Sequence, residues 1–120
     1  MIWARWGSLF MFLGIALGAF GGHALKASLS EDMQKIYQIG VFYHIVHALA
    51  LFIVAWLSTV KPMAGGIAQA GWAFAAGIVL FSGSLYLLSI TGIRQLGMIT
   101  PLGGLSFLAG WLLLAINAKG

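Results

Sequence analysis

Four long runs of apolar residues, separated by short polar links, constrain the fold of this chain more than any motif does. They cover residues 6–22, 41–60, 68–90 and 99–118. A helix needs about 20 apolar residues to cross the roughly 30 Å hydrocarbon core of a bilayer, so each run can form one span. Charged side chains make up only 7% of the 120 residues, whereas soluble domains carry about 25%. We therefore predict an all-α integral membrane protein in which residues 1–120 form a single transmembrane domain.

The links between the runs are brief, which favours antiparallel neighbours and predicts an up-down-up-down four-helix bundle. The longest link, residues 24–39, is polar and carries signals for a helix of its own. Ser30 can cap that helix, and Glu31 and Asp32 suit the positive end of its dipole. The sequence therefore predicts a short amphipathic helix at the membrane interface between the first and second spans.

Glycines in the first run recur at intervals of four residues, at Gly14, Gly18 and Gly22. Small residues at this spacing let two helix backbones approach closely in lipid. We expect the first span to be a central packing helix, with Gly18 close to another helix. A cleaved signal peptide is the alternative for this run, but a glycine packing face would have no use in a discarded segment.

Antiparallel spans divide the polar residues unevenly between the two ends of the bundle. All five tryptophans lie toward one end, where interfacial anchoring explains them. The opposite end, which we call the histidine face, collects His23, Lys26, Glu31, Asp32, Lys35, Tyr37, Gln38, Tyr43, His44, His47, Arg94, Gln95 and Thr100. Lys and Arg residues divide equally between the two ends, so the positive-inside rule gives no orientation.

The histidine face contains the residues most suited to chemistry. His44 and His47 are three positions apart and fall on one face of a helix, and an ionisable side chain at membrane depth needs a partner or a role. Topology predicts that His23 converges with one of them close to a membrane boundary. It also predicts a polar cluster in which Arg94 approaches Glu31 or Asp32.

Three readings of the histidines remain open at this point. They can form hydrogen bonds between helices, or His23, His44 and His47 can ligate a metal such as zinc. Haem would need His23 opposite one of the other two, because His44 and His47 share a helix turn. Proton or ion movement is the third reading, although no Asp, Glu, Lys or Arg lies at mid-depth in any run.

Composition argues against several other functions. The chain has no Cys, which removes thiolate chemistry. Glu31 and Asp32 are adjacent, so on a helix they point about 100° apart and form no facing acid–base pair. Six scattered basic residues form no patch for nucleic acid, whereas Lys26 and Arg94 could hold a lipid phosphate.

Three sequence strings carry a resemblance that covers nearly the whole chain. They are LGAFGGHAL at residues 17–25, YHIVHALAL at residues 43–51 and TGIRQLGMITPLGG at residues 91–104. These strings resemble the YgdD/YwdK family of small bacterial inner-membrane proteins of unknown function, which has relatives in mitochondria. One departure is Gly22, where alanine is expected. The resemblance implies a multi-pass protein of the bacterial inner (cell) membrane and implies no reaction.

These observations together favour a protein that is not an enzyme. We expect a structural, accessory or interaction component that binds membrane lipids at the histidine face. Its partners are then lipids, further copies of itself or a larger membrane complex. The alternative function is a histidine-centred metal or haem site, or proton and ion handling, and the sequence names no cofactor.

Overall fold

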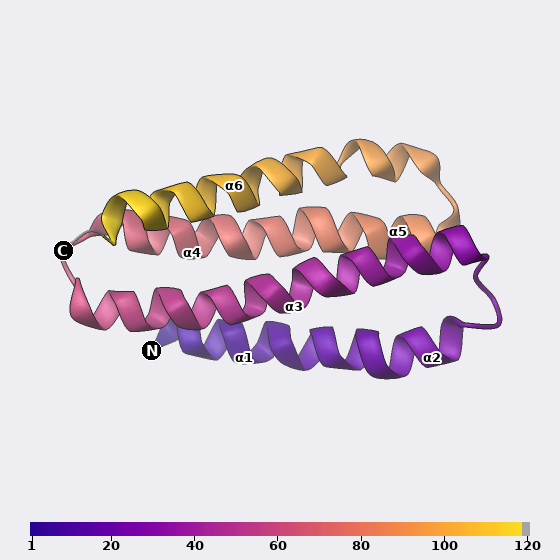
Figure 1. Ribbon diagram of the computed structural model, residues 1–120, viewed down its shortest axis with the longest axis horizontal. Helices are drawn as coiled ribbons and strands as arrows, with labels where there is room; N and C mark the ends of the chain where they lie inside the picture. The colour runs from indigo at the N-terminus through magenta and orange to yellow at the C-terminus, as the bar shows by residue number, and fades with distance from the viewer. Residues whose placement is uncertain (119–120) are drawn as a thin grey trace.

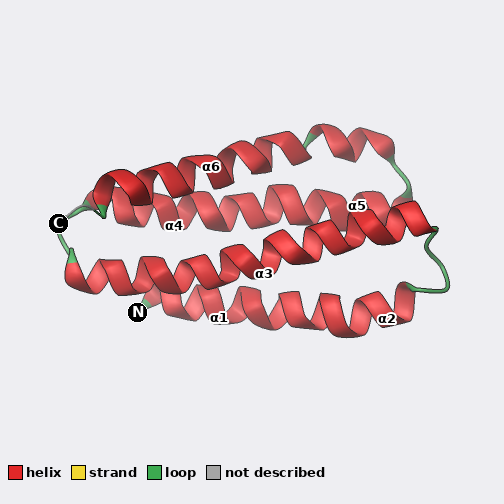
Figure 2. Cartoon of the chain, viewed as in Figure 1, coloured by secondary structure: helices red, strands yellow, loops and turns green. Residues whose placement is uncertain are grey.

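The computed structural model describes residues 1–118. Four long helical rods lie side by side and run antiparallel, with both termini at one end of the molecule (Figure 1). The described residues are helical apart from short links and contain no strand (Figure 2). In chain order the elements are α1 (Ile2–Ile15), η1 (Ala16–Gly21), α2 (Gly22–Leu25), α3 (Glu31–Val60), α4 (Gly65–Gly77), η2 (Ile78–Ser82), α5 (Gly83–Thr91), η3 (Arg94–Met98) and α6 (Thr100–Asn117).

Each rod is long and apolar enough to cross a membrane, so the predicted all-α fold with four spans is confirmed. The candidate spans are Ile2–Leu25, Glu31–Val60, Gly65–Thr91 and Arg94–Asn117. Two of them contain a π-helical segment, η1 in the first span and η2 in the third. The fourth begins with the 3₁₀ turn η3.

The helix that contains the second apolar run begins ten residues before that run. Ser30 caps α3 as expected, because its hydroxyl accepts a hydrogen bond from the backbone N–H of Met33. The helix then continues without a break from Glu31 to Val60. The predicted interfacial helix is therefore not a separate element, and its residues form the first turns of α3. No residue between Ser30 and Gly40 interrupts the helix, and Gly40 itself packs against the ring of Tyr86.

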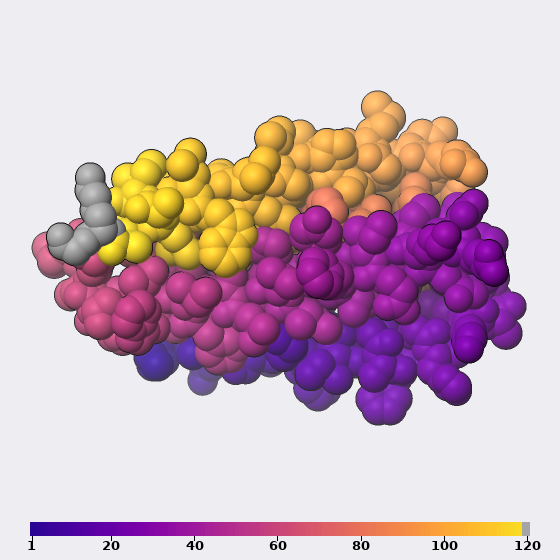
Figure 3. Space-filling model, in the orientation of Figure 1, coloured from indigo at the N-terminus to yellow at the C-terminus, as the bar shows by residue number. Residues whose placement is uncertain are grey.

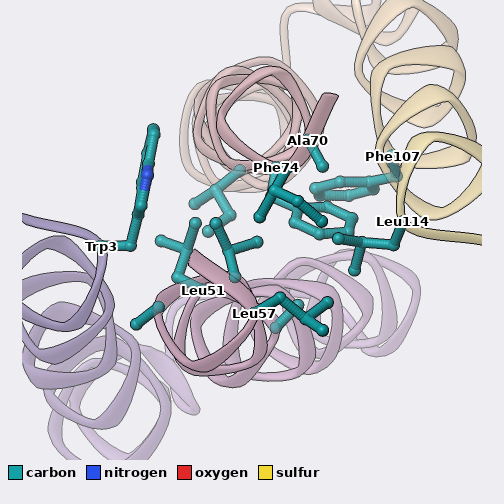
Figure 4. Close-up of a cluster of buried hydrophobic side chains, with 12 residues drawn as sticks. Trp3, Leu51, Leu57, Ala70, Phe74, Phe107 and Leu114 are labelled. Carbon is teal, nitrogen blue, oxygen red and sulfur yellow. The ribbon is translucent and has the colours of Figure 1, made fainter. Parts of the chain in front are cut away.

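The centre of the bundle is α3, and the expectation that the first span is central was wrong. Half of the most apolar stretch of α3 is buried, against 6% in the first span. On one side α3 packs along α1, and on the other it packs against α4, η2 and α5. Figure 4 shows α1 and α6 on opposite sides of the α3–α4 pair. On the surface visible in Figure 3, the side chains of α3 lie between those of α1 and those of α6.

Glycines on α1 and η1 form the surface on which α3 packs. A Cβ atom added at Gly18 would lie 2.9 Å from Cγ1 of Val41, so the predicted close approach of Gly18 to another helix is confirmed. One added at Gly7 would lie 3.1 Å from the carbonyl oxygen of Ala48. Such distances leave no room for a side chain, and this is how small residues let helices pack in lipid.

The main apolar core lies in the half of the bundle that holds the tryptophans (Figure 4). Leu51 and Val54 of α3 are fully buried there, and Phe74 of α4 lies between them and α6. Trp3 reaches from α1 to α4, where its ring covers Gly71 and packs edge-to-face with Trp72, the ring centroids lying 5.2 Å apart. This core holds the four rods in register and fixes the positions of the two inner histidines.

Candidate functional site

His44 lies on α3 and joins three of the four rods through its two ring nitrogens. Its Nε2 is 2.7 Å from the carbonyl oxygen of Phe10 on α1, and its Nδ1 is 2.8 Å from the hydroxyl of Tyr86 on α5. Gly14 makes this possible, because a Cβ atom there would lie 3.2 Å from Cδ2 of the imidazole. The glycine face of the first span therefore provides the space in which His44 reaches the backbone of α1.

The partners of His44 define its tautomer. A carbonyl oxygen can only accept, so Nε2 carries the proton and donates it to Phe10. In the neutral ring Nδ1 is then an acceptor, and the hydroxyl of Tyr86 donates to it. Both nitrogens are thus used within the bundle, and neither has a lone pair free for a metal ion.

His47 has the opposite tautomer. Its Nδ1 donates to the carbonyl oxygen of Tyr43 one turn earlier, at 2.8 Å. Its Nε2 accepts from the indole N–H of Trp111 on α6, at 3.0 Å. The imidazole also stacks on Phe107, with ring centroids 3.6 Å apart and planes 7° from parallel. His47 therefore ties α3 to α6 by a hydrogen bond and by an aromatic stack.

Both imidazoles lie deeper than the sequence predicts. His44 faces Phe10 and Gly14, near the middle of the first span, and His47 faces Phe107 and Trp111, well inside the fourth. The two histidines do not lie at the start of their helix, because α3 begins at Glu31 and they follow more than three helical turns later.

His23 does not join the other two histidines. It is exposed on α2, nine positions beyond Gly14, which corresponds to about 13 Å along a helix. Within residues 1–118 no group of three or more His, Cys, Asp or Glu side chains could hold a metal ion. The structure therefore does not assemble the predicted three-histidine site, and the same separation removes the haem arrangement in which His23 supplies the opposite ligand.

The predicted polar cluster is not assembled either. Glu31, Asp32 and Arg94 are all exposed at the same end of the bundle. Across the part of the chain that the structure describes, no ion pair joins Arg94 to either carboxylate. Topology brings these residues to one face, as expected, but it does not bring their charges into contact.

Hydroxyl side chains make further bonds between rods that the sequence analysis missed. Tyr37 donates to the carbonyl oxygen of Leu17, and Ser82 donates to that of Gly40 at 2.7 Å. Ser106 donates to the carbonyl oxygen of Ala73 at 2.7 Å. For Ser82 and Ser106 the available signal was a hydroxyl in an apolar run, since such a group needs a partner in lipid.

Two of these bonds fall on the π-helical segments. Leu17 belongs to η1, and Ser82 belongs to η2. A π segment places one more residue in a turn than an α-helix does, and such segments are frequent at functional sites. No buried side-chain nitrogen or oxygen in the described residues lacks a hydrogen-bond partner. The buried polar side chains of these residues thus satisfy one another or are satisfied by backbone groups.

Two grooves open from this closed interior toward the surrounding lipid. The first, which we call the aromatic groove, has a volume of ≈ 700 Å³ and lies between α3, η2 and α6. It is lined by Tyr43, Val46, His47, Phe81, Pro101, Gly104, Leu105, Phe107, Leu108 and Trp111. The second, the tryptophan groove, has a volume of ≈ 490 Å³ and is lined by Trp3, Trp6, Phe10, Trp72, Ala75, Ala76, Val79 and Leu80.

Comparison with known proteins places the chain in a family. A family model described as a protein of unknown function (DUF423) matches residues 17–104, which include all three histidines. The chain belongs to the DUF423 family. This confirms the resemblance drawn from the three sequence strings, since the relatives include YwdK of Bacillus subtilis strain 168, a protein named UPF0382 membrane protein YwdK.

The family relatives match along nearly their whole length. YwdK is 46% identical over 112 residues, which cover 93% of this chain and 91% of YwdK. A UPF0382 membrane protein of Staphylococcus haemolyticus is 42% identical over 111 residues, covering 92% of this chain and 89% of the relative. No solved structure matches the chain. The chain is therefore a membrane protein of a family whose function is uncharacterised.

Proposed function

We propose that this DUF423 protein is a non-enzymatic, multi-pass component of the bacterial cell (inner) membrane that acts as an accessory or interaction partner and binds membrane lipids. The observation that carries the proposal is that all four ring nitrogens of His44 and His47 are hydrogen-bonded within the bundle. Each ring uses one nitrogen to donate and the other to accept, and all four partners belong to the chain itself. Imidazoles bonded in this way fix helix register.

The same geometry argues against the histidine-centred alternative. Metal ligation requires a neutral imidazole nitrogen with a free lone pair. Both acceptor nitrogens are already engaged, that of His44 by Tyr86 and that of His47 by Trp111. A proton path also needs polar groups that continue to both ends of the bundle. The chain of bonds through His44 instead ends at a backbone carbonyl of α1.

Lipid binding is supported by the charged groups that remain on the histidine face. Lys26, Lys35 and Arg94 are all exposed at that end. Basic side chains next to an anionic membrane surface contribute about 1 kcal/mol each to attraction for lipid phosphates. We propose that anionic headgroups associate with these three residues, while the bundle itself stays fixed in the membrane.

Native mass spectrometry of the protein released from lipid nanodiscs tests this headgroup binding. Nanodiscs of phosphatidylcholine alone are compared with nanodiscs that also contain phosphatidylglycerol. We expect retained phosphatidylglycerol on the wild-type protein and loss of most of it in the Lys35→Gln/Arg94→Gln variant. Arg5→Gln is the matched control, because Arg5 is exposed at the opposite end. Equal retention in all three proteins would refute binding at this face.

Elemental analysis of protein purified without a polyhistidine tag tests the metal alternative. We expect far less than one transition-metal ion per chain. Proteoliposomes loaded with a pH-sensitive dye provide the matching test for proton movement, and we expect no flux above that of empty vesicles. A stoichiometric metal that disappears in both His44→Ala and His47→Ala would overturn the proposal in favour of the histidine-centred site.

A further inference from the structure

The aromatic groove contains a hydrogen-bonding group that the bundle does not use. The hydroxyl of Tyr43 has no hydrogen-bond partner anywhere in residues 1–118, and the side chain is 39% exposed. The other polar side chains of this groove, His47 and Trp111, are bonded to each other. Tyr43 therefore contributes to the lining of the groove a side chain whose hydroxyl is unpaired.

This hydroxyl belongs to a ring that lies inside the apolar part of the bundle. The 30 residues of α3 make a helix about 45 Å long, and Tyr43 lies about 18 Å from its start. Its ring lies beside Phe107, with ring centroids 6.2 Å apart, and Phe107 follows the start of α6 by seven residues, about 10 Å along the helix. A hydroxyl without an acceptor is costly in that environment, so a ligand that offers an acceptor is favoured there.

The walls of the groove favour a flat ligand. The rings of Tyr43, His47 and Phe107 are nearly parallel, with Tyr43 inclined by 10° to His47 and by 11° to Phe107. His47 and Phe107 are only 3% and 4% exposed, so the exposed ring of the three is that of Tyr43, beside which a flat conjugated ring can stack. Leu105 and Leu108 continue the lining along α6 with aliphatic side chains, which suit an alkyl tail.

We propose that the aromatic groove binds a lipid-soluble quinone, a flat conjugated ring that bears carbonyl oxygens and an alkyl tail. The Tyr43 hydroxyl donates to one ring carbonyl, the quinone ring packs beside the ring of Tyr43, and the tail extends past Leu105 and Leu108. The groove volume of ≈ 700 Å³ lies within the range of about 300–1,000 Å³ that small-molecule sites occupy. This binding is independent of the headgroup binding proposed above, which concerns the end of the bundle.

The tryptophan groove serves as an internal comparison. It is lined by aromatic and aliphatic residues and has no hydroxyl among them. A saturated acyl chain fits such a surface, whose only side-chain donors are the indole N–H groups of its three tryptophans, whereas the aromatic groove adds the hydroxyl of Tyr43. The two grooves therefore differ in the chemistry of the molecule that each can select.

Saturable quenching of tryptophan fluorescence by decylubiquinone, measured on the protein in nanodiscs, tests the proposal. Decylbenzene, which has the same tail but no ring oxygen, is the competitor. Tyr43→Phe removes the hydroxyl alone and should weaken quinone binding about threefold to tenfold, the effect of one lost hydrogen bond. Gly104→Leu should weaken it by about tenfold or more, because a Cβ atom there meets only the Phe81 ring, at 3.9 Å, and a leucine would fill the groove.

Ala76→Leu is the matched control, because it places a leucine side chain in the tryptophan groove instead and should leave quinone binding unchanged. Quenching that does not saturate, or that is equal in all four proteins, would show partition into lipid and overturn the proposal. Displacement by decylbenzene as effective as by quinone, together with unchanged binding in Tyr43→Phe, would show a site for alkyl chains and would also overturn it. Because Tyr43→Phe keeps the ring, a folding defect in Gly104→Leu would still leave a decisive measurement.

Discussion

His44 and His47 lie on the same helix, one turn apart and equally buried, yet they hold the bundle together in different ways. His44 is enclosed by a glycine-lined helix and bonds to the backbone of α1 and to the side chain of Tyr86. His47 bonds to its own helix and to Trp111, and its ring is part of an aromatic stack beside an open groove. Both imidazoles are thus nearly fully buried, but only that of His47 belongs to the lining of a groove.

The comparison shows that the burial of an ionisable side chain does not determine its role. Each histidine is 3% exposed. The two histidines differ in what surrounds each ring, and in whether those surroundings can fill the space left when the side chain is removed. At His44 the neighbours are backbone and rings of packed helices, whereas at His47 a lipid tail can enter from the groove. The two positions should therefore respond differently to the same substitution.

Truncation of His44 should produce the largest effect. His44→Ala removes two bonds between rods and leaves a space enclosed by α1, α3 and α5, so we expect a loss of about 2–4 kcal/mol in unfolding free energy. His47→Ala should cost less, about 1–3 kcal/mol, because lipid can fill the space that opens on the groove. Unfolding in mixed detergent micelles measures both values, and a larger loss at position 47 would contradict the comparison.

Filling the space in front of His44 should have the next largest effect. Gly14→Leu places a side chain where a Cβ atom already lies 3.2 Å from the imidazole, and we expect a loss of about 1–3 kcal/mol. Ala19→Leu is the matched control, because Ala19 is exposed on the same span and should tolerate leucine. Thermal unfolding of both variants in the same detergent provides the measurement; equal stability of the two would mean that α1 does not pack on α3 through this glycine.

Removing one hydrogen-bond donor to each histidine should lower the unfolding free energy by a smaller amount. Tyr86→Phe leaves Nδ1 of His44 without a donor in an enclosed position, for which we expect a cost of about 0.5–1.5 kcal/mol. Trp111→Phe leaves Nε2 of His47 without a donor but keeps an aromatic ring beside the groove. A double-mutant cycle with each histidine isolates the two bond energies, and the His44–Tyr86 coupling should be the larger.

The last prediction concerns the tautomers of the two histidines, which differ very little in free energy. His44 should be protonated at Nε2 and His47 at Nδ1, because each of those nitrogens faces a carbonyl oxygen. Imidazole ¹⁵N chemical shifts of the selectively labelled protein distinguish the two tautomers. Two histidines in the same tautomer would show that at least one of the carbonyl bonds is not formed.

Much of the architecture follows from the sequence alone. The four apolar runs, the short links, the cap at Ser30 and the close approach of Gly18 were all predicted and are present. These features depend on local composition and spacing, which a single sequence displays directly. The family assignment from the three sequence strings was also correct.

The depth and partners of the histidines could not be predicted in the same way. The second span was expected to begin at residue 41, which placed His44 near a boundary, but α3 begins at Glu31 and carries His44 about 20 Å along the helix. The choice of central helix was wrong for a related reason. Glycines on the first span indicate close packing, but they do not reveal that only one side of that span is covered. The partner of His44 on α5, Tyr86, lies 42 positions away, and no local pattern connects the two.

The bond from His44 to the carbonyl oxygen of Phe10 has a consequence for how this fold can drift in evolution. A main-chain carbonyl is supplied by whichever amino acid occupies position 10, so replacing Phe10 leaves the acceptor in place. Mutations at positions 10 and 44 therefore need not compensate each other, and paired substitutions would not reveal this contact. We expect selection to act instead at position 14, where any side chain larger than hydrogen would come between the imidazole and the backbone of α1.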